Sequence, residues 1–228
     1  LISIFILLLI IFLIGIILSG NRMPFILFLF LITLILVFQK ELRKYLIFFF
    51  TILSLIFLII YNFNTEVRIN FQNFYKQIYG ISKILTSKNI ETNTPQYFKE
   101  FESFYNTWTL NKYLGGGIKN FRYYCHVRPH IDREAGFICN MHPHNYYLEI
   151  LTETGLVGLF LILIIFSITI YKALTKKYFF TQNYEDNLIL APFLFLFFVE
   201  IFPIKSTGSF FTTGNATYLF LLMGILIG

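Results

Sequence analysis

Charged residues are scarce in this sequence of 228 residues, since only 13% are Asp, Glu, Lys or Arg. An ordinary soluble domain carries about 25% charged residues, so the composition excludes a typical soluble globular protein. Hydrophobic residues instead make up 57% of the sequence and aromatic residues 20%, and the mean hydropathy is +0.69. The sequence therefore predicts a protein built for a lipid bilayer.

Motifs of several soluble enzyme classes are also missing. The sequence has no D-x-D pair of the kind that holds a metal ion and a nucleotide sugar. The glycine-rich stretch Leu114–Phe121 is not followed by the Lys-Ser/Thr pair that completes a phosphate-binding loop. We attribute the net charge of +6 to cytoplasmic anchoring and to contact with lipid headgroups. Nothing in the sequence suggests a nucleic acid partner.

Six apolar runs approach the roughly 20 residues that a helix needs to cross a bilayer. They are Leu1–Leu18, Met23–Phe38, Tyr45–Tyr61, Gly155–Leu174, Leu188–Ile204 and Ala216–Gly228. We therefore expect an all-α, polytopic membrane protein with about six transmembrane helices. Because the sequence begins within an apolar run, we expect it to be the C-terminal part of a longer protein, and we expect its last helix to be truncated.

Basic residues in two short loops predict the orientation in the membrane. Gln39–Lys44 and Tyr171–Tyr178 are rich in Lys and Arg, which are in excess in cytoplasmic loops. Six crossings place both loops on one side, which we assign to the cytoplasm. The long polar segment 62–154 then lies outside, between the helices of 1–61 and those of 155–228.

The external segment is expected to be mostly helical. Asn70–Ser87 and Thr94–Asn111 both show aromatic and aliphatic residues at helical spacing, which predicts amphipathic helices. Five aromatic residues share one broad face of the second helix: Tyr97, Phe101, Phe104, Tyr105 and Trp108. Packing against a neighbouring element is the simplest explanation, and sugar stacking by Tyr105 or Trp108 is the alternative.

Both cysteines lie in this segment, on the outer side of the membrane, where disulfides persist. A bond between Cys125 and Cys139 would stabilise the intervening loop by about 3 kcal/mol on the chain-entropy model. A zinc site is the competing interpretation, because four histidines lie nearby: His126, His130, His142 and His144. However, the sequence lacks a C-x-x-C pair, and Pro129 disfavours a helix through His130. Free thiols are the third alternative, and we favour the disulfide.

The stretch "HPHNYYLEILTETGLVG" (His142–Gly158) predicts a helix that begins near Pro143 and Asn145. The expected helix carries one common face: His144, Tyr147, Leu148, Leu151 and Gly155. Gly155 and Gly158 would let a neighbouring helix approach closely. At the positive end of the helix dipole, a neutral His144 beside an anion site is a plausible general base. An interfacial histidine that caps the helix is the simpler alternative.

The same stretch resembles the signature of the O-antigen ligase and polymerase superfamily. In that signature nine residues separate a His-Asn pair from a Gly, which is followed by a small residue, as His144-Asn145 are followed by Gly155 and Gly158 in this sequence. "LGGGIKNFRYYC" (Leu114–Cys125) resembles the G-x-G-x-K-x-F-R-x-x-C element of many proteobacterial members.

"STGSFF" (Ser206–Phe211) resembles a later external loop of the same superfamily, so that the resemblance covers roughly residues 60–215. Members often have a Gly-His or Gly-Arg pair early in this region, and "NTPQYFKEF" (Asn93–Phe101) has neither. One polar contact of the family is therefore absent from this chain or supplied elsewhere.

The resemblance implies a metal-independent glycosyltransferase of the bacterial inner membrane, with its large loop in the periplasm. Such an enzyme takes a saccharide from undecaprenyl diphosphate and joins it to a sugar hydroxyl. In a ligase, the function that we favour, the acceptor is the lipid A core. In a polymerase, the alternative, the acceptor is another lipid-linked glycan.

Residue roles follow from the resemblance and from the chemistry that it implies. His144 is the expected general base for the acceptor hydroxyl. Arg122 and Arg68 are expected to bind the donor diphosphate, because a guanidinium binds phosphate oxygens bidentately and stays charged. Arg68 has a simpler alternative as an interface anchor, and Arg122 as the partner of a loop carboxylate. Lys119 and Asn145 are further substrate-binding candidates, and no cofactor is expected because arginines take the place of a metal.

A transporter of lipid-linked glycans is the alternative from another functional class. A transporter is expected to place ionisable residues within its membrane spans. The predicted spans of this chain are nearly free of charge, and Glu200 is the clearest exception. Because the polar residues are concentrated in the external segment, we favour chemistry at the membrane surface.

Overall fold

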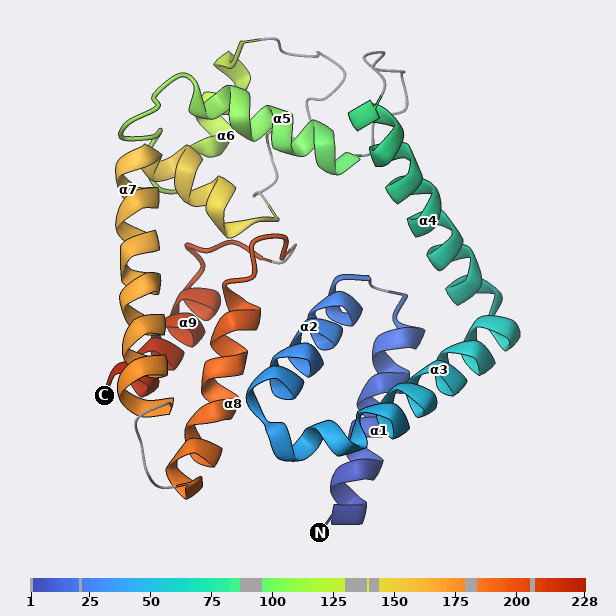
Figure 1. Ribbon diagram of the computed structural model, residues 1–228. Helices are drawn as coiled ribbons and strands as arrows, with labels where there is room; N and C mark the ends of the chain where they lie inside the picture. Colours follow the sequence, from blue (N-terminus) through green and yellow to red (C-terminus); the bar gives the residue numbers. More distant parts are fainter. Residues whose placement is uncertain are drawn as a thin grey trace. The chain divides into compact units, whose positions relative to one another are not determined.

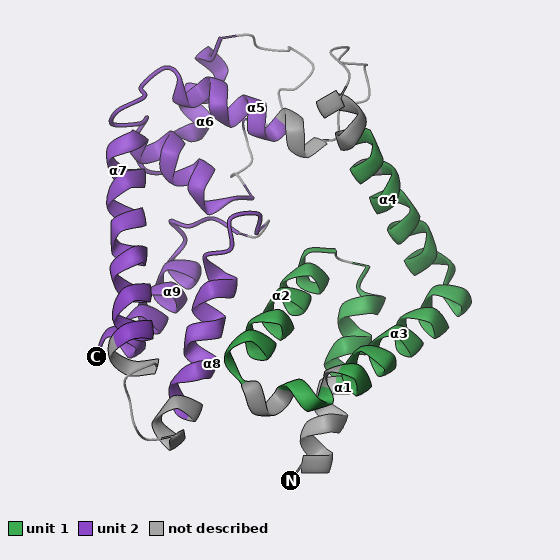
Figure 2. Cartoon of the chain, viewed as in Figure 1, with its two compact units in different colours: residues 1–95 green, residues 96–228 purple. Residues whose placement is uncertain are grey.

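The computed structural model describes residues 2–20, 22–86, 96–129, 139, 144–178, 184–205 and 208–228, and the regular structure within them is all helical. The predicted all-α class is therefore confirmed. The chain divides into two compact units, residues 1–95 and residues 96–228, and each is described by itself (Figure 2). The division falls inside the predicted external segment 62–154 rather than at its ends.

Unit 1 is built from apolar helices and one amphipathic helix. Its elements are α1 (Ile2–Leu18), α2 (Arg22–Phe38), the 3-10 helix η1 (Lys40–Tyr45), α3 (Leu46–Phe63) and α4 (Thr65–Thr86). The buried core is small and consists of aliphatic residues: Leu13, Ile17, Leu53 and Val67. Rings from three helices pack on it, with Phe71 of α4 edge-on to both Phe25 and Phe57.

Unit 2 contains the rest of the helices. They are α5 (Gln96–Trp108), α6 (Phe121–Tyr124), the 3-10 helix η2 (Cys125–Val127), α7 (Tyr146–Tyr171), the π-helix η4 (Lys172–Tyr178), α8 (Tyr184–Glu200) and α9 (Thr213–Ile227). One small core lies around α5 and α6, where the rings of Phe104 and Phe121 stack at 3.8 Å between centroids. The long part of α7 packs on α8 and α9, and Phe166 meets Phe197 edge-on there.

Two helical stretches of the described part are long and apolar enough to cross a membrane, Arg43–Phe63 and Tyr146–Thr175. Three shorter apolar helices accompany them: Arg22–Phe38, Ile189–Glu200 and Thr213–Ile227. The predicted apolar runs therefore do form helices. Six crossings and the orientation of the helices stay predictions, because length and composition support a crossing for two stretches.

The predicted apolar face of α5 is wrong in part. Phe104 is buried, but Phe101 and Tyr105 are exposed, and the side chain of Tyr97 lies outside the described residues. The buried face is instead largely polar and follows helical spacing: Glu100, Ser103, Phe104 and Thr107. The reason is that α5 packs on the first, polar part of α7, where the Thr152 hydroxyl lies 3.5 Å from the Phe104 carbonyl oxygen.

Candidate functional site

Helix α7 begins with a side-chain cap. Asn145 has extended backbone angles (φ −147°, ψ 123°), and its Oδ1 accepts the N–H groups of Tyr147 (3.0 Å) and Leu148 (3.2 Å). A short polar side chain is favoured at this position because it satisfies helical N–H groups that lack an intrahelical partner. His144 therefore precedes the helix and is half-buried, and the predicted helical face that starts at His144 is wrong.

The cap also bears on two predictions: that the start of α7 binds an anion, and that Asn145 binds substrate. Two of the N–H groups that could bind an anion at the helix start, those of Tyr147 and Leu148, already donate to Oδ1. The Nδ2 group of Asn145 donates to the Pro203 carbonyl oxygen at 2.6 Å, and the residue is buried. Asn145 therefore fixes the helix start, and its predicted contact with substrate stays a prediction.

A sharp break divides α7 at Gly155, whose backbone is non-helical (φ 68°, ψ −166°). Figure 1 shows the first part of α7 lying across the long second part rather than continuing it. A positive φ is accessible to glycine at little cost because glycine has no Cβ. The polar first part, 146–154, is thereby turned out of line with the apolar second part.

The loop before α6, residues 112–117, is hydrogen-bonded to the α7 backbone on both sides of this break. Four backbone hydrogen bonds join the loop to α7. The N–H groups of Gly116 and Gly117 donate to the carbonyl oxygens of Thr152 (3.0 Å) and Glu153 (2.8 Å). In the other direction, the N–H groups of Leu156 and Val157 donate to the carbonyl oxygens of Lys112 (2.9 Å) and Tyr113 (3.2 Å). The loop thus supplies donors to the carbonyl groups before the break and acceptors to the N–H groups after it. Buried backbone groups are almost always paired, and these bonds pair the groups that the break in the helix would otherwise leave without a partner.

The close approach at Gly155 accounts for the glycines of the loop. A Cβ at Gly155 would overlap the backbone of Tyr113, and one at Gly115 would overlap the backbone of Glu153. The partner at Gly155 is therefore a loop, whereas the sequence predicted a neighbouring helix. At Gly158 the nearest atoms to a Cβ belong to the Thr154 side chain of the same helix, and its predicted role in helix packing stays a prediction.

Glu149 anchors the loop between α8 and α9 to the first part of α7. Its carboxylate is buried and accepts the Ser209 hydroxyl (2.5 Å) and the Phe210 N–H (2.5 Å). Tyr147 adds a bond from its hydroxyl to the Ile201 carbonyl oxygen at 2.5 Å. The start of α7 and the segment 201–210 are thus held together by polar contacts.

Glu200, the residue singled out within a predicted span, belongs to the same contact region. Its Oε1 accepts the Tyr146 hydroxyl at 2.7 Å, and its Oε2 lies 2.5 Å from the Lys205 ammonium. Lys205 also lies over the Tyr146 ring, 5.1 Å from the centroid. Glu200 is therefore paired with groups beside the site, as ionisable residues near or within membrane spans usually are.

Lys119 lies close to the acidic face of α7. It has a positive φ of 61°, and it interacts electrostatically with the Glu149 and Glu153 carboxylates. The Oε2 atom of Glu153 is buried and accepts no hydrogen bond from the described residues. The exposed Lys119 side chain thus stays a candidate for contact with an anionic substrate, beside two buried carboxylates.

A disulfide joins Cys125 and Cys139, with their Cα atoms 5.4 Å apart. The buried Arg128 guanidinium donates to the Cys125 carbonyl (2.5 Å) and contacts both sulfur atoms at 2.9 Å. The bonded sulfurs are not available as zinc ligands, so the alternative metal site would need other donors. Of its histidines, His126 is exposed on η2, and His130 and His142 lie outside the described residues.

The two arginines predicted to bind the diphosphate belong to different units. Arg122 is exposed on α6, one residue after the buried Phe121 of unit 2. Arg68 is half-buried on α4 of unit 1, next to the buried Val67. Both side chains are therefore carried by ordered helices, and their role towards a substrate stays a prediction.

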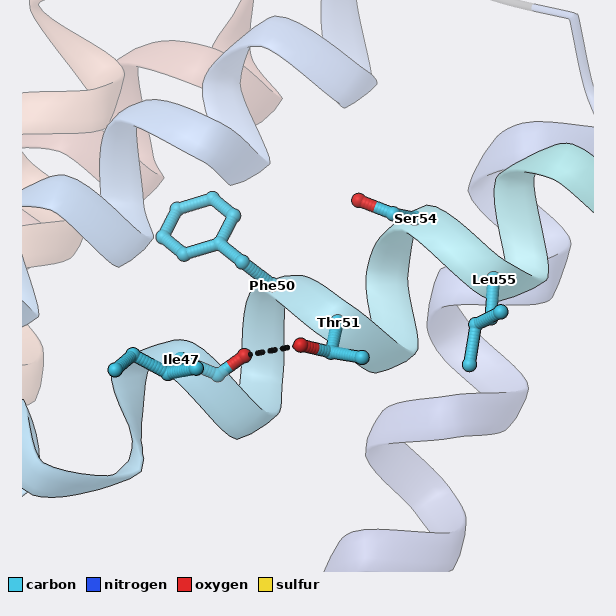
Figure 3. A pocket seen from close by; sticks show the side chains of 5 residues that line it. All are labelled: Ile47, Phe50, Thr51, Ser54 and Leu55. Atoms are coloured by element: carbon cyan, nitrogen blue, oxygen red, sulfur yellow. Dashed lines mark hydrogen bonds between the residues drawn. The ribbon is translucent and has the colours of Figure 1, made fainter.

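An apolar groove on unit 1 differs from this polar region. It runs along α3 and is lined by Ile47, Phe50, Thr51, Ser54 and Leu55 (Figure 3). The Thr51 hydroxyl bonds to the Ile47 carbonyl of its own helix at 2.7 Å. The groove lining carries no charged side chain, so it suits hydrocarbon and not the chemistry of a diphosphate.

Comparison with protein families matches residues 7–163, more than half of the chain, to the O-antigen ligase family. The chain belongs to this family. The match includes the broken helix start with His144 and Gly155, and the glycine loop that closes the break. No curated protein and no solved structure matches the chain. Members of the O-antigen ligase family are integral membrane proteins of glycosyltransferase type that act on lipid-linked glycans.

Sequence reasoning missed several polar residues of this candidate site. They are Arg128, Glu149, Glu153, Lys205 and Ser209, which are all buried or half-buried polar groups. A signal was present for two of them: Glu149 and Glu153 are four residues apart, so they share one helix face directly before the glycine signature. Two acidic residues on one face of a short helix indicate a polar contact surface.

Proposed function

We propose that this protein transfers a saccharide from undecaprenyl diphosphate to a sugar hydroxyl at the periplasmic face of the inner membrane. The observation that carries the proposal is the position of His144, directly before a capped helix start that is bonded to the 201–210 segment. Family membership supports this class of reaction. A ligase acting on the lipid A core is the preferred assignment, and a polymerase uses the same chemistry on a lipid-linked acceptor.

In the proposed reaction His144 takes the proton of the acceptor hydroxyl as its oxygen attacks the reducing-end carbon of the saccharide. The bond from that carbon to the diphosphate oxygen breaks, and undecaprenyl diphosphate leaves with the electron pair. Arg122, Arg68 and Lys119 are proposed to balance the charge of the leaving diphosphate. Arginine suits this role because its planar guanidinium binds two phosphate oxygens at once.

The test is His144→Ala in the full-length protein, expressed in strains that lack either the ligase or the polymerase. Glycan ladders on gels, at matched protein levels, should fall by roughly 10²–10⁴-fold, the usual range for a lost general base. His126→Ala, an exposed histidine on η2, is the matched control and should keep normal ladders. Normal ladders from His144→Ala would overturn the proposal, and loss with His142→Ala alone would move the base to His142. The strain that is complemented identifies the acceptor.

A further inference from the structure

Tyr146, Glu200 and Lys205 form a closed network in which each side chain contacts the other two. The Tyr146 hydroxyl bonds to one oxygen of Glu200, Lys205 pairs with the other oxygen, and the Lys205 ammonium lies over the Tyr146 ring. Tyr146 is 6% exposed and Glu200 is 9% exposed. The charges of this network are therefore largely shielded from water, where pairing matters most.

The network joins two helix ends. Tyr146 is the first residue of α7, and Glu200 is the last residue of α8. The end of a helix carries partial negative charge, so a buried carboxylate there is unfavourable unless a cation balances it. Lys205 supplies that cation. Loss of either member of a buried pair leaves the other charge uncompensated, whereas loss of both removes the problem.

Two adjacent residues bind the same short segment. Asn145 donates to the Pro203 carbonyl oxygen, and Tyr146 donates to Glu200, so the segment 200–205 is held at both ends beside the start of α7. His144 directly precedes these two residues, so its backbone is attached to this fixed point. The position of its imidazole therefore depends on how firmly Asn145 and Tyr146 are held.

We propose that Tyr146, Glu200 and Lys205 are positioning residues that fix the start of α7 against the end of α8 and thereby place His144. This inference rests on the proposed function of His144. It assigns Lys205 to balancing the charge of Glu200 rather than to binding the donor diphosphate.

The experiment compares Glu200→Gln, Lys205→Met and the double variant in the purified full-length protein in detergent. The donor is the lipid-linked glycan extracted from the producing cells, and binding is measured separately with undecaprenyl diphosphate as the probe. Each single variant should lower kcat on the order of 10–100-fold, the effect of misplacing a reacting group by about 1 Å. The donor KM and the Kd for undecaprenyl diphosphate should stay within about twofold of their original values.

The double variant decides between a pair and two independent residues. Its kcat should recover to within about fivefold of the unmodified protein, because no uncompensated charge remains. A double variant as slow as the slower single variant, or a weaker Kd for undecaprenyl diphosphate with Lys205→Met, would overturn the inference. Glu102→Gln, at an exposed position of α5, and Lys172→Met, at the start of η4, are the matched controls, which should keep the original kcat.

A milder variant covers the case in which neither single variant folds. Tyr146→Phe removes only the hydroxyl that bonds to Glu200 and keeps the ring under Lys205. It should lower kcat about threefold to tenfold with KM unchanged, and a normal kcat would overturn the inference. A different result would refute the proposed function itself, namely full transfer activity in His144→Ala. An inactive His144→Ala together with a fully active Glu200→Gln leaves the proposed function standing and refutes the positioning role.

Discussion

The two units of the chain use polar side chains in different ways. In the described part of unit 1, Thr and Asn side chains within the helices bond to carbonyl groups of the same helix, as Thr33 does to Leu29, Thr51 to Ile47 and Asn62 to Leu58. One longer-range bond there runs from the Arg22 guanidinium to the Asn70 carbonyl, 48 positions away. In unit 2, side-chain bonds join positions 54 to 60 residues apart: Tyr146 to Glu200, Asn145 to Pro203 and Glu149 to Ser209. The first kind satisfies a hydroxyl or amide locally, and the second kind fixes one element against another.

This difference indicates where chemistry is to be expected. A reacting group must be held within about 0.5 Å of its productive position, which needs bonds between elements. Apolar packing alone, as in the Leu13–Ile17–Leu53–Val67 core of unit 1, gives affinity between helices but less directional precision. We therefore expect the general base and the groups that position it in unit 2, and contact with lipid along the α3 groove of unit 1.

The largest expected effect comes from the break in α7. Gly155→Ala should destabilise the protein on the order of 4 kcal/mol, because alanine is strained at φ 68° and its Cβ would overlap the Tyr113 backbone. Gly15→Ala in α1 is the matched control from unit 1, since its Cβ would meet no atom within 4 Å. It should be neutral or stabilise by up to about 1 kcal/mol through helix propensity. The unfolding midpoint in detergent measures both, and equal losses would remove the distinction between the two glycines.

The disulfide gives the next largest effect. Replacing Cys125 and Cys139 together by serine should lower the free energy of unfolding by about 3 kcal/mol, because the denatured chain regains the freedom of the closed loop. Added dithiothreitol should lower the unfolding midpoint of the unmodified protein and leave that of the double variant unchanged. Mass spectrometry of the unreduced protein should also show the linked peptides. Free thiols with a zinc content near one atom per chain would argue for the metal site instead.

Local features of this fold were predictable from the sequence, and long-range ones were not. Asn145 reads as a helix cap because capping depends on the next three residues, and the apolar runs read as helices because their length and composition are local. The break at Gly155 depends on the backbone of Lys112–Gly117, which is about 40 positions away. The pairing of Tyr146 with Glu200 depends on tertiary contact across 54 positions. No spacing rule encodes such a partner, so the sequence indicated His144 but not what holds it.

A smaller effect is expected from the hydroxyl that bonds to Glu149. Ser209→Ala should destabilise the protein by about 1.5–2 kcal/mol, because the buried carboxylate loses a charge-assisted hydrogen bond and keeps the one from the Phe210 N–H. Transfer activity should fall with it, since Ser209 holds the 201–210 segment against α7. If Ser209→Ala changes neither the free energy of unfolding nor the transfer activity, the bond between Ser209 and Glu149 does not stabilise the protein. This long-range bond would then no longer distinguish unit 2 from unit 1.

The smallest effect is expected in the α3 groove, with Thr51→Val. Valine has nearly the same shape as threonine, and the Thr51 hydroxyl bonds only to the Ile47 carbonyl, which keeps its place in the helix. The change should alter the free energy of unfolding by less than about 0.5 kcal/mol, because no other element relies on this hydroxyl and an added methyl group suits an apolar surface. Unfolding in detergent and glycan ladders, measured beside Ser209→Ala, provide the test. A loss as large as that of Ser209→Ala would show that local polar bonds in unit 1 matter as much as the long-range bonds of unit 2, and the contrast between the two units would fail.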